Sequence, residues 1–316
     1  MLTIIIFSNS RYHYLFSLLQ DLSRSRVNIC IVDFGKKKDK IQEYKKIKKK
    51  NIKLIFNDKC SSFAQRFVKY LKSVKTKYVW FIGDDDRIES TYLDQLLIFL
   101  KNNNYSGLTL GHISFDKDFL IKKKKQFKKI KSNNLNIFDE IHNLGMMSAQ
   151  IINVKNFQEI SKDLNKKILI KYGYPHLYII IKMIEKFKNW QKLENKIVYY
   201  RFNNINKDKK SLLNRLNCEF NGYLLPLKET YDNDKIKNLY KKIFFNNIIS
   251  WIILCITIVG RKETLKILIK NNKIVPFIFY IYFLQLIFLV LPIKIILILK
   301  KIKNDLFFKE SVLKNN

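Results

Sequence analysis

The sequence contains few cysteines, and none of them are spaced as a pair. Only four occur in 316 residues, and no Cys-x-x-Cys is present. They are Cys30, Cys60, Cys218 and Cys255. Disulfide frameworks and structural zinc sites need cysteines at matched spacings, so we expect neither, and the scatter fits a reducing compartment.

The sequence also lacks a phosphate-binding loop of the P-loop kind, a recognisable signal peptide and an internal repeat. No Gly-rich loop of the P-loop kind is present, which argues against phosphate chemistry of that type. The apolar N-terminus, Leu2–Phe7, is too short for a signal peptide and lacks its basic region, so we expect it to be the first strand. No internal repeat is visible.

Arginine is scarce although basic residues dominate. The net charge is +34, yet only eight of the 60 basic residues are arginine. Asparagine and isoleucine are frequent, as in proteins from A+T-rich genomes, so we attribute part of the charge to codon usage. Proteins that read bases favour arginine for bidentate contacts. The charge therefore indicates an anionic membrane surface as a partner, and we expect no nucleic acid.

Residues 1–115 alternate between short apolar runs and helical patterns, and the periodicity loosens after them. Strands are expected at Leu2–Phe7, Asn28–Asp33, Lys53–Phe56, Tyr78–Gly83, Leu108–Phe115, Met146–Val154 and Ile197–Phe202. Helices are expected near residues 12–22, 39–50, 61–74 and 91–101, and at Ile168–Phe187. This alternation predicts an α/β fold whose mostly parallel sheet is flanked by helices.

Three consecutive carboxylates, Asp84, Asp85 and Asp86, follow the buried strand expected at Tyr78–Gly83. Ligands of such sheets bind beyond the carboxyl ends of the strands. Neighbouring aspartates repel one another, and a divalent cation that also holds a diphosphate relieves this repulsion. Mg²⁺ or Mn²⁺ suits oxygen ligands, and Asp86 lies farthest beyond the strand. The alternative is a solvated turn before a helix capped by Ser90.

The last third of the chain is apolar and basic. Two apolar stretches, Ile243–Val259 and Ile274–Leu299, are flanked by lysines, and the second is long enough to cross a ~30 Å hydrocarbon layer. Basic residues in every flank favour a re-entrant or in-plane hairpin at least as well as two spans. Packing on the rest of the protein is the remaining alternative. We expect a catalytic domain over residues 1–205 and a helical, membrane-associating region over residues 206–316.

An ordered set of motifs resembles the GT-A-fold, family 2 glycosyltransferases over roughly residues 1–200. The motifs are Leu2–Arg11, Ile31–Gly35, Asn57 with Ser62–Arg66, and Gly83–Asp86, the last matching the Asp-x-Asp metal motif. Within the family, the chain is similar to bacterial surface-polysaccharide transferases of the abequosyltransferase-like group. The resemblance implies a Rossmann-like GT-A sheet and a hexosyltransferase-type enzyme. That enzyme would transfer one sugar, with inversion, from a nucleotide-sugar donor to a lipid-linked or lipopolysaccharide/capsule-type glycan.

The resemblance also implies roles for individual residues. The donor-binding residues would be Ser8, Asn9, Arg11, Asp33, Arg66, Asp84 and Asp85, and the metal ligands Asp86 and Asp84. Asp33 could accept a hydrogen bond from a base, or could be a turn residue. Arg66 could reach a diphosphate or base, or could be a solvated helix residue.

The family's general base is an aspartate, often in a Glu-Asp pair that opens a helix. This chain has Tyr172–His176 at the comparable place, without a carboxylate. His176 is our candidate base; it could also be a ligand to metal or phosphate, or an ordinary residue at the helix start. Asp139 is a weaker alternative. The next candidates are Glu140 and His142, then His112 and Asp116.

The leading hypothesis is thus a glycosyltransferase at the cytoplasmic face of the inner membrane, where it is peripheral, re-entrant or C-terminally anchored. A nucleotidyl- or phosphotransferase with the same acidic site is the second hypothesis. A non-enzymatic, basic membrane- or nucleic-acid-binding protein is the third.

Overall fold

The computed structural model describes residues 1–23, 25–35, 51–56, 58–115, 130–171, 174–201, 208–243 and 248–272. The lysine-rich helix expected near 39–50, Asn57, Asp116 and the stretch Ile274–Leu299 lie outside these residues. The chain divides into two compact units, Met1–Ile205 and Asn206–Asn316, which are described separately.

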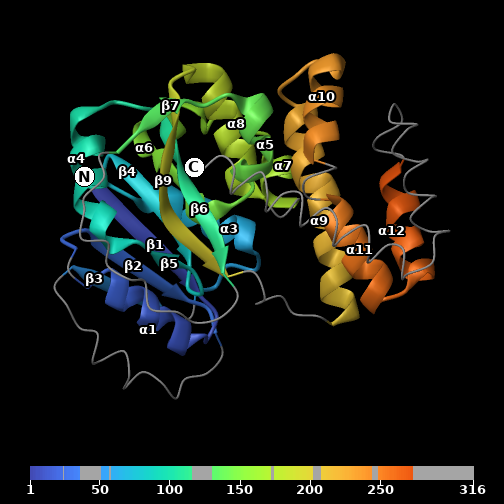
Figure 1. Ribbon diagram of the computed structural model, residues 1–316, viewed down its shortest axis with the longest axis horizontal. Coiled ribbons are helices and arrows are strands. Elements are labelled where there is room, and N and C mark those ends of the chain that lie inside the picture. The colour runs from blue at the N-terminus through green and yellow to red at the C-terminus, as the bar shows by residue number, and fades with distance from the viewer. Residues whose placement is uncertain are drawn as a thin grey trace, which may run out of the picture. The chain divides into compact units, whose positions relative to one another are not determined.

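The first unit is built on one mixed sheet (Figure 1). Four strands are parallel and lie in the order β3, β2, β1, β4. They are β1 (Leu2–Ser8), β2 (Asn28–Asp33), β3 (Ile52–Phe56) and β4 (Tyr78–Gly83). All four were expected from the sequence.

The sheet continues beyond β4 with strands of both directions. They are β5 (Arg87–Ile88), β6 (Gly107–Phe115), β7 (Ser132–Asn134), β8 (Gln150–Asn153) and β9 (Trp190–Arg201). β8 is antiparallel to both β4 and β6, whereas β6 and β9 are parallel. β5 and β7 both pair antiparallel with β9. The expected α/β class, a central sheet flanked by helices, is confirmed.

Alternate residues of β1 and β4 face opposite layers of helices, because side chains alternate along a strand. Ile4, Ile6 and Trp80 join a core with leucines of α1 (Tyr12–Asp21) and α4 (Leu93–Asn102). On the other face, the rings of Phe7 and Phe81 stack with 5.5 Å between their centroids. The ring centroid of Phe81 lies 4.1 Å from that of Phe67 in α3 (Phe63–Ser73). The strand ends are thereby fixed between two helical layers.

The remaining helices of this unit are α5 (Ile137–Leu144), α6 (Val154–Ile160), α7 (Lys166–Lys171) and α8 (Pro175–Phe187). A single helix over Ile168–Phe187 was therefore the wrong prediction. Pro175 lies in the first turn of α8, where its missing N–H costs nothing, so it begins a second helix. Ser90 does not cap a helix directly either: a short 3₁₀ turn, Ser90–Tyr92, leads into α4.

The second unit is helical. It contains α9 (Lys209–Lys228), α10 (Asn233–Ile243), α11 (Ile249–Ile258) and α12 (Arg261–Asn272), and α9 contacts the other three. Among the residues that the structure describes, no helix combines the length and apolar character needed to span a bilayer.

Candidate active site

The carboxyl ends of β1, β2 and β4 meet at one edge of the sheet. In the strand register, Ser8 pairs with Asp33, and Phe7 pairs with Gly83. The polar residues that follow these strands therefore converge from three distant parts of the sequence. This edge is where ligands of parallel α/β sheets bind.

Arg11 joins the β1 loop to the acidic residues after β4. Its Nη1 lies 2.9 Å from Asp85 Oδ2, its Nη2 lies 3.3 Å from Asp85 Oδ1, and Nη2 also forms an ion pair with Asp84 Oδ1. The loop reaches this position through Ser10, whose φ of 59° is left-handed. The contacts place one guanidinium across two of the three consecutive carboxylates.

Asp84 is a buried carboxylate, with a side chain that is 0% exposed. Its Oδ2 accepts a hydrogen bond from the Asn9 N–H at 3.3 Å. Burial raises the pKa of Asp84, the charge of Arg11 opposes this rise, and the charge of Asp85 adds to it. A buried anion needs a partner charge, and Arg11 supplies it.

Asp86 is held by a 3₁₀ turn, Met147–Ala149, and by the end of β9. Its Oδ2 accepts a hydrogen bond from the Ser148 hydroxyl, and its Oδ1 accepts one from the Arg201 N–H at 3.3 Å. Ser148 is in turn fixed by Trp80, whose Nε1–H donates to the Ser148 carbonyl at 2.7 Å. Burial, together with the charge of Asp85, raises the pKa of Asp86 to about 7.

One carboxylate oxygen of Asp85 and one of Asp86 lie close to the position that a Gly83 side chain would occupy. A Cβ placed on Gly83 would lie 2.9 Å from Asp85 Oδ1 and 3.2 Å from Asp86 Oδ2. Glycine therefore leaves room for two convergent oxygens. Within the described residues, no group of three or more His, Cys, Asp or Glu side chains could hold a metal ion.

Two hard oxygen ligands still fit Mg²⁺ or Mn²⁺, because such ions usually take one or two carboxylates and complete their shells with water and phosphate. The converging oxygens belong to Asp85 and Asp86. Asp84, which we expected beside Asp86 as a ligand, pairs with Arg11, as Asp85 also does.

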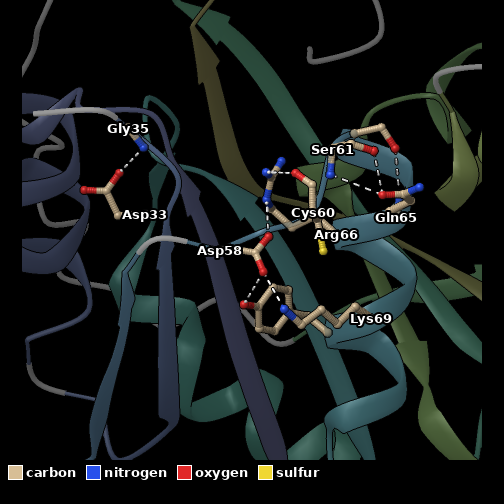
Figure 2. A network of polar contacts seen from close by, with 10 residues as sticks. Asp33, Gly35, Asp58, Cys60, Ser61, Gln65, Arg66 and Lys69 are labelled. Carbon is tan, nitrogen blue, oxygen red and sulfur yellow. Dashed lines mark hydrogen bonds and ion pairs between the residues drawn. The ribbon is translucent and has the colours of Figure 1, made fainter.

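Asp33 lies at the end of β2 and is buried, with 3% of its surface exposed. Its Oδ2 accepts from the Tyr12 hydroxyl at 2.8 Å. Its Oδ1 accepts from the Gly35 N–H at 2.8 Å (Figure 2). These contacts fix the position of the carboxylate.

Arg66 is not a solvated helix residue. Its Nε lies 2.8 Å from Asp58 Oδ2, and its Nη2–H donates to the Cys60 carbonyl at 2.9 Å (Figure 2). Its guanidinium lies 4.0 Å from the centre of the Phe34 ring, next to Asp33. α3 and the end of β2 thus present a stacked arginine–phenylalanine pair beside the carboxylate.

Asp58 organises this group. Burial alone would raise its pKa, but hydrogen bonds from Lys69, Cys60, Arg66 and Tyr70 outweigh burial and lower the pKa to about 2. The Lys69 Nζ lies 2.5 Å from Asp58 Oδ1. The carboxylate is therefore ionised at neutral pH and holds Arg66 in place.

His176 lies at the start of α8 and is 3% exposed. Its Nε2 lies 2.8 Å from the Gly145 carbonyl, and its ring packs 5.9 Å from Phe67. These contacts belong to the core behind the sheet edge. Asp139 is exposed in the first turn of α5, where a carboxylate stabilises the helix N-terminus.

Sequence reasoning missed three residues of this site. Ser148 and Arg201 contact Asp86 from 62 and 115 residues away, and Asp58 carries no motif. Two residues near Asp58 gave a signal in the sequence: Ser62, which caps α3, and Arg66 on the same helix. Arg66 is buried, and a buried arginine needs an acidic partner.

Comparison with known proteins identifies the family of this chain. The model of Glycosyl transferase family 2 matches residues 3–167, more than half of the chain. No curated protein matches.

Solved structures of S. aureus TarS residues 1–349 are similar at 12% identity. The first of these structures has a TM-score of 0.57 and covers 83% of this chain and 82% of that one. The complex with UDP-GlcNAc has a TM-score of 0.62 and covers 87% and 81%. At this identity the likeness shows the fold alone, which is the expected GT-A fold. Since the family model spans most of the first unit, the chain belongs to glycosyl transferase family 2 and is a glycosyltransferase.

Proposed function

We propose that this enzyme transfers one sugar from a nucleotide-sugar donor to a glycan acceptor, with a divalent cation and with inversion. The observation that carries the proposal is the convergence of Asp85 Oδ1 and Asp86 Oδ2 at the end of β4. S. aureus TarS has been crystallised with UDP and with UDP-GlcNAc, which supports a donor of the same chemical class.

The nucleoside would lie between the ends of β1, β2 and β4. Asp33 has the acceptor oxygens for a base N–H, and the Phe34–Arg66 pair offers a planar, cationic surface beside it. Ser8, Asn9 and Asp84 lie at the adjoining strand end, where ribose hydroxyls would reach.

The chain's own residues prepare the site for the diphosphate. When bound, Mg²⁺ or Mn²⁺ would neutralise charge on the departing nucleotide. Asp85 and Asp86 would hold it, and Ser148 would keep Asp86 oriented. Arg11 is 36% exposed on its side chain and so could turn toward a phosphate while staying near Asp84.

The acceptor would be lipid-linked or of the lipopolysaccharide/capsule type, at the cytoplasmic face of the inner membrane. The narrower resemblance to the abequosyltransferase-like group supports this class. α12 supports membrane contact, because Leu265 and Ile269 are exposed one turn apart beside exposed lysines 262, 266 and 270. A lysine close to anionic lipid contributes about 1 kcal/mol.

A panel of UDP-, GDP- and CDP-sugars tests the proposal. We expect one donor to raise the melting temperature and to release its nucleotide with Mn²⁺ but not with a chelator. Asp86→Asn should abolish release, whereas Asp94→Asn, a change of an exposed carboxylate on α4, should not. Equal turnover with and without chelator, or an active Asp86→Asn enzyme, would refute the metal role.

A further inference from the structure

The transfer reaction needs a group that removes the proton of the acceptor hydroxyl. His176, the histidine in the family's usual place, has its Nε2 on the Gly145 carbonyl and is buried. His13 is exposed on the outer face of α1. A third histidine, His112, lies in β6 and fits the requirement.

A bulge between β6 and β9 redirects the side chain of His112. The pairing register shifts between Thr109 and Gly111 and again between Gly111 and His112. The two backbones approach closely there: a Cβ on Gly111 would lie 2.4 Å from the Asn195 carbonyl oxygen. Bulges are common beside active sites because they re-aim one side chain without ending the strand.

Two neighbouring residues of β9, Tyr200 and Arg201, connect His112 with Asp86. The His112 ring lies 5.7 Å from the Tyr200 ring in an edge-on arrangement. Tyr200 directly precedes Arg201, whose N–H donates to Asp86 Oδ1. Burial raises the pKa of Tyr200, and the negative charge of Asp86 raises it further, so this phenol also lies within electrostatic reach of the acidic site.

The contacts of His112 leave one ring nitrogen available as a base. Its Nδ1 lies 3.5 Å from the Leu110 carbonyl, which can only accept, so this contact favours the tautomer with the proton on Nδ1. Within the described part of the chain, Nε2 makes no hydrogen bond, so its lone pair faces no competing donor.

Burial favours the neutral form of the His112 ring. Burial lowers the pKa of His112, the charge of Glu140 from α5 raises it, and the charge of Lys192 from β9 lowers it. Glu140 and Lys192 form an ion pair with 2.6 Å between Nζ and Oε1, so their charges act on the ring in opposite directions. Tyr200 is the other titratable group that faces the ring.

We propose that His112 is the general base of the transfer reaction, an inference that rests on the proposed function. Its Nε2 takes the proton from the acceptor hydroxyl as that oxygen forms a bond to the anomeric carbon. The bond between this carbon and the donor's phosphate oxygen breaks, and its electron pair leaves with the nucleoside diphosphate.

Two variants test the role. His112→Asn keeps a donor at the position of Nδ1 and removes the base, and His112→Gln places an uncharged amide near the position of Nε2. The matched control is His13→Gln, on the exposed face of α1. Each protein is given the nucleotide-sugar that the donor panel identifies, with Mn²⁺. Donor affinity is measured by calorimetry, and nucleotide release to water gives kcat.

General-base catalysis contributes about 10²–10⁴-fold. We expect both His112 variants to lose kcat by at least about 100-fold while donor affinity and melting temperature stay within a few-fold and a few degrees of wild type. The His13 control should match wild type. A kcat within threefold of wild type would overturn the proposal, as would a loss of donor affinity that accounts for the loss of rate. If no donor of the panel binds even to the wild-type protein, the proposed function is refuted, and the assignment of His112 as its general base is refuted with it.

Discussion

Removing the Arg11 guanidinium tests whether Arg11 and a divalent cation compete for the carboxylates of the acidic loop. Arg11 contacts Asp85 at 2.9 and 3.3 Å and pairs with Asp84. In Arg11→Gln, both carboxylates lose their positive neighbour. We therefore expect Mn²⁺ to bind the donor-free variant more tightly than it binds the wild-type protein.

The magnitude follows from charge separation. Two unit charges 4 Å apart interact with roughly 4 kcal/mol at an effective dielectric constant of 20. This value is an upper limit for the repulsion between Arg11 and the cation, because Arg11 is partly exposed and screened. Retaining about one third to two thirds of that value predicts a fall in the Mn²⁺ dissociation constant of roughly tenfold to a hundredfold. Burial of Asp84 works against this gain, since an unpaired buried carboxylate takes up a proton.

The assay is Mn²⁺ titration of the nucleotide-free protein, followed by calorimetry and by the electron paramagnetic resonance of free Mn²⁺. Arg11→Lys retains the charge and should stay close to wild type. Arg26→Gln removes an exposed arginine away from the acidic loop and controls for net charge. Unchanged or weaker Mn²⁺ binding by Arg11→Gln, with the fold intact by circular dichroism, would show that Arg11 and the cation do not compete for these carboxylates.

Three further changes should report on the same edge of the sheet. Gly83→Ala should weaken Mn²⁺ binding at least tenfold by calorimetry, because a methyl group would enter the space 2.9 Å from Asp85 Oδ1; unaltered binding would remove the convergence argument. Asp58→Asn should lower the free energy of unfolding by about 1–3 kcal/mol in urea and weaken donor binding, since Arg66 loses its partner. If Asp58→Asn leaves donor affinity unchanged, Arg66 has no part in nucleotide binding. Metal-free protein should lose stability as pH rises from about 4 through about 7, because the raised pKa of Asp86 favours its protonated form in the folded state. Added Mn²⁺ should restore the melting temperature at pH 7.5, and a melting temperature independent of pH would contradict this.

The sequence carried enough information to predict the strands and the edge where they meet. Short apolar runs such as Tyr78–Gly83 have one stable place, the inside of a sheet, and the residues after them must then lie at its carboxyl edge. Asp33 and Asp84 could be placed in this way. The split between α7 and α8 was also encoded, by Pro175, but the apolar periodicity on both sides of it suggested one helix.

Contacts between distant segments could not be predicted. The partners of Asp86 lie 62 and 115 residues away, on segments whose register depends on a bulge and on the packing of Trp80. The burial of His176 also depends on distant residues. Its ring packs against Phe67, and its Nε2 contacts the Gly145 carbonyl, so this histidine lies in the core although it stands at the start of a helix. Local pattern sets which element a residue joins, and tertiary packing sets what its side chain touches.

The acidic loop is held from both ends before any ligand binds. On one side Arg11 spans Asp84 and Asp85; on the other, Arg87 forms a bidentate pair with Asp21 of α1 at 2.6 and 2.7 Å. A bidentate guanidinium fixes both position and orientation, so the backbone between Gly83 and Arg87 has little freedom to rearrange. The two pairs differ in exposure: the Arg87 side chain is 10% exposed and the Arg11 side chain 36%. Ligand binding can therefore displace the Arg11 contacts at low cost while the Arg87 pair keeps the carboxylates of Asp85 and Asp86 aimed over Gly83.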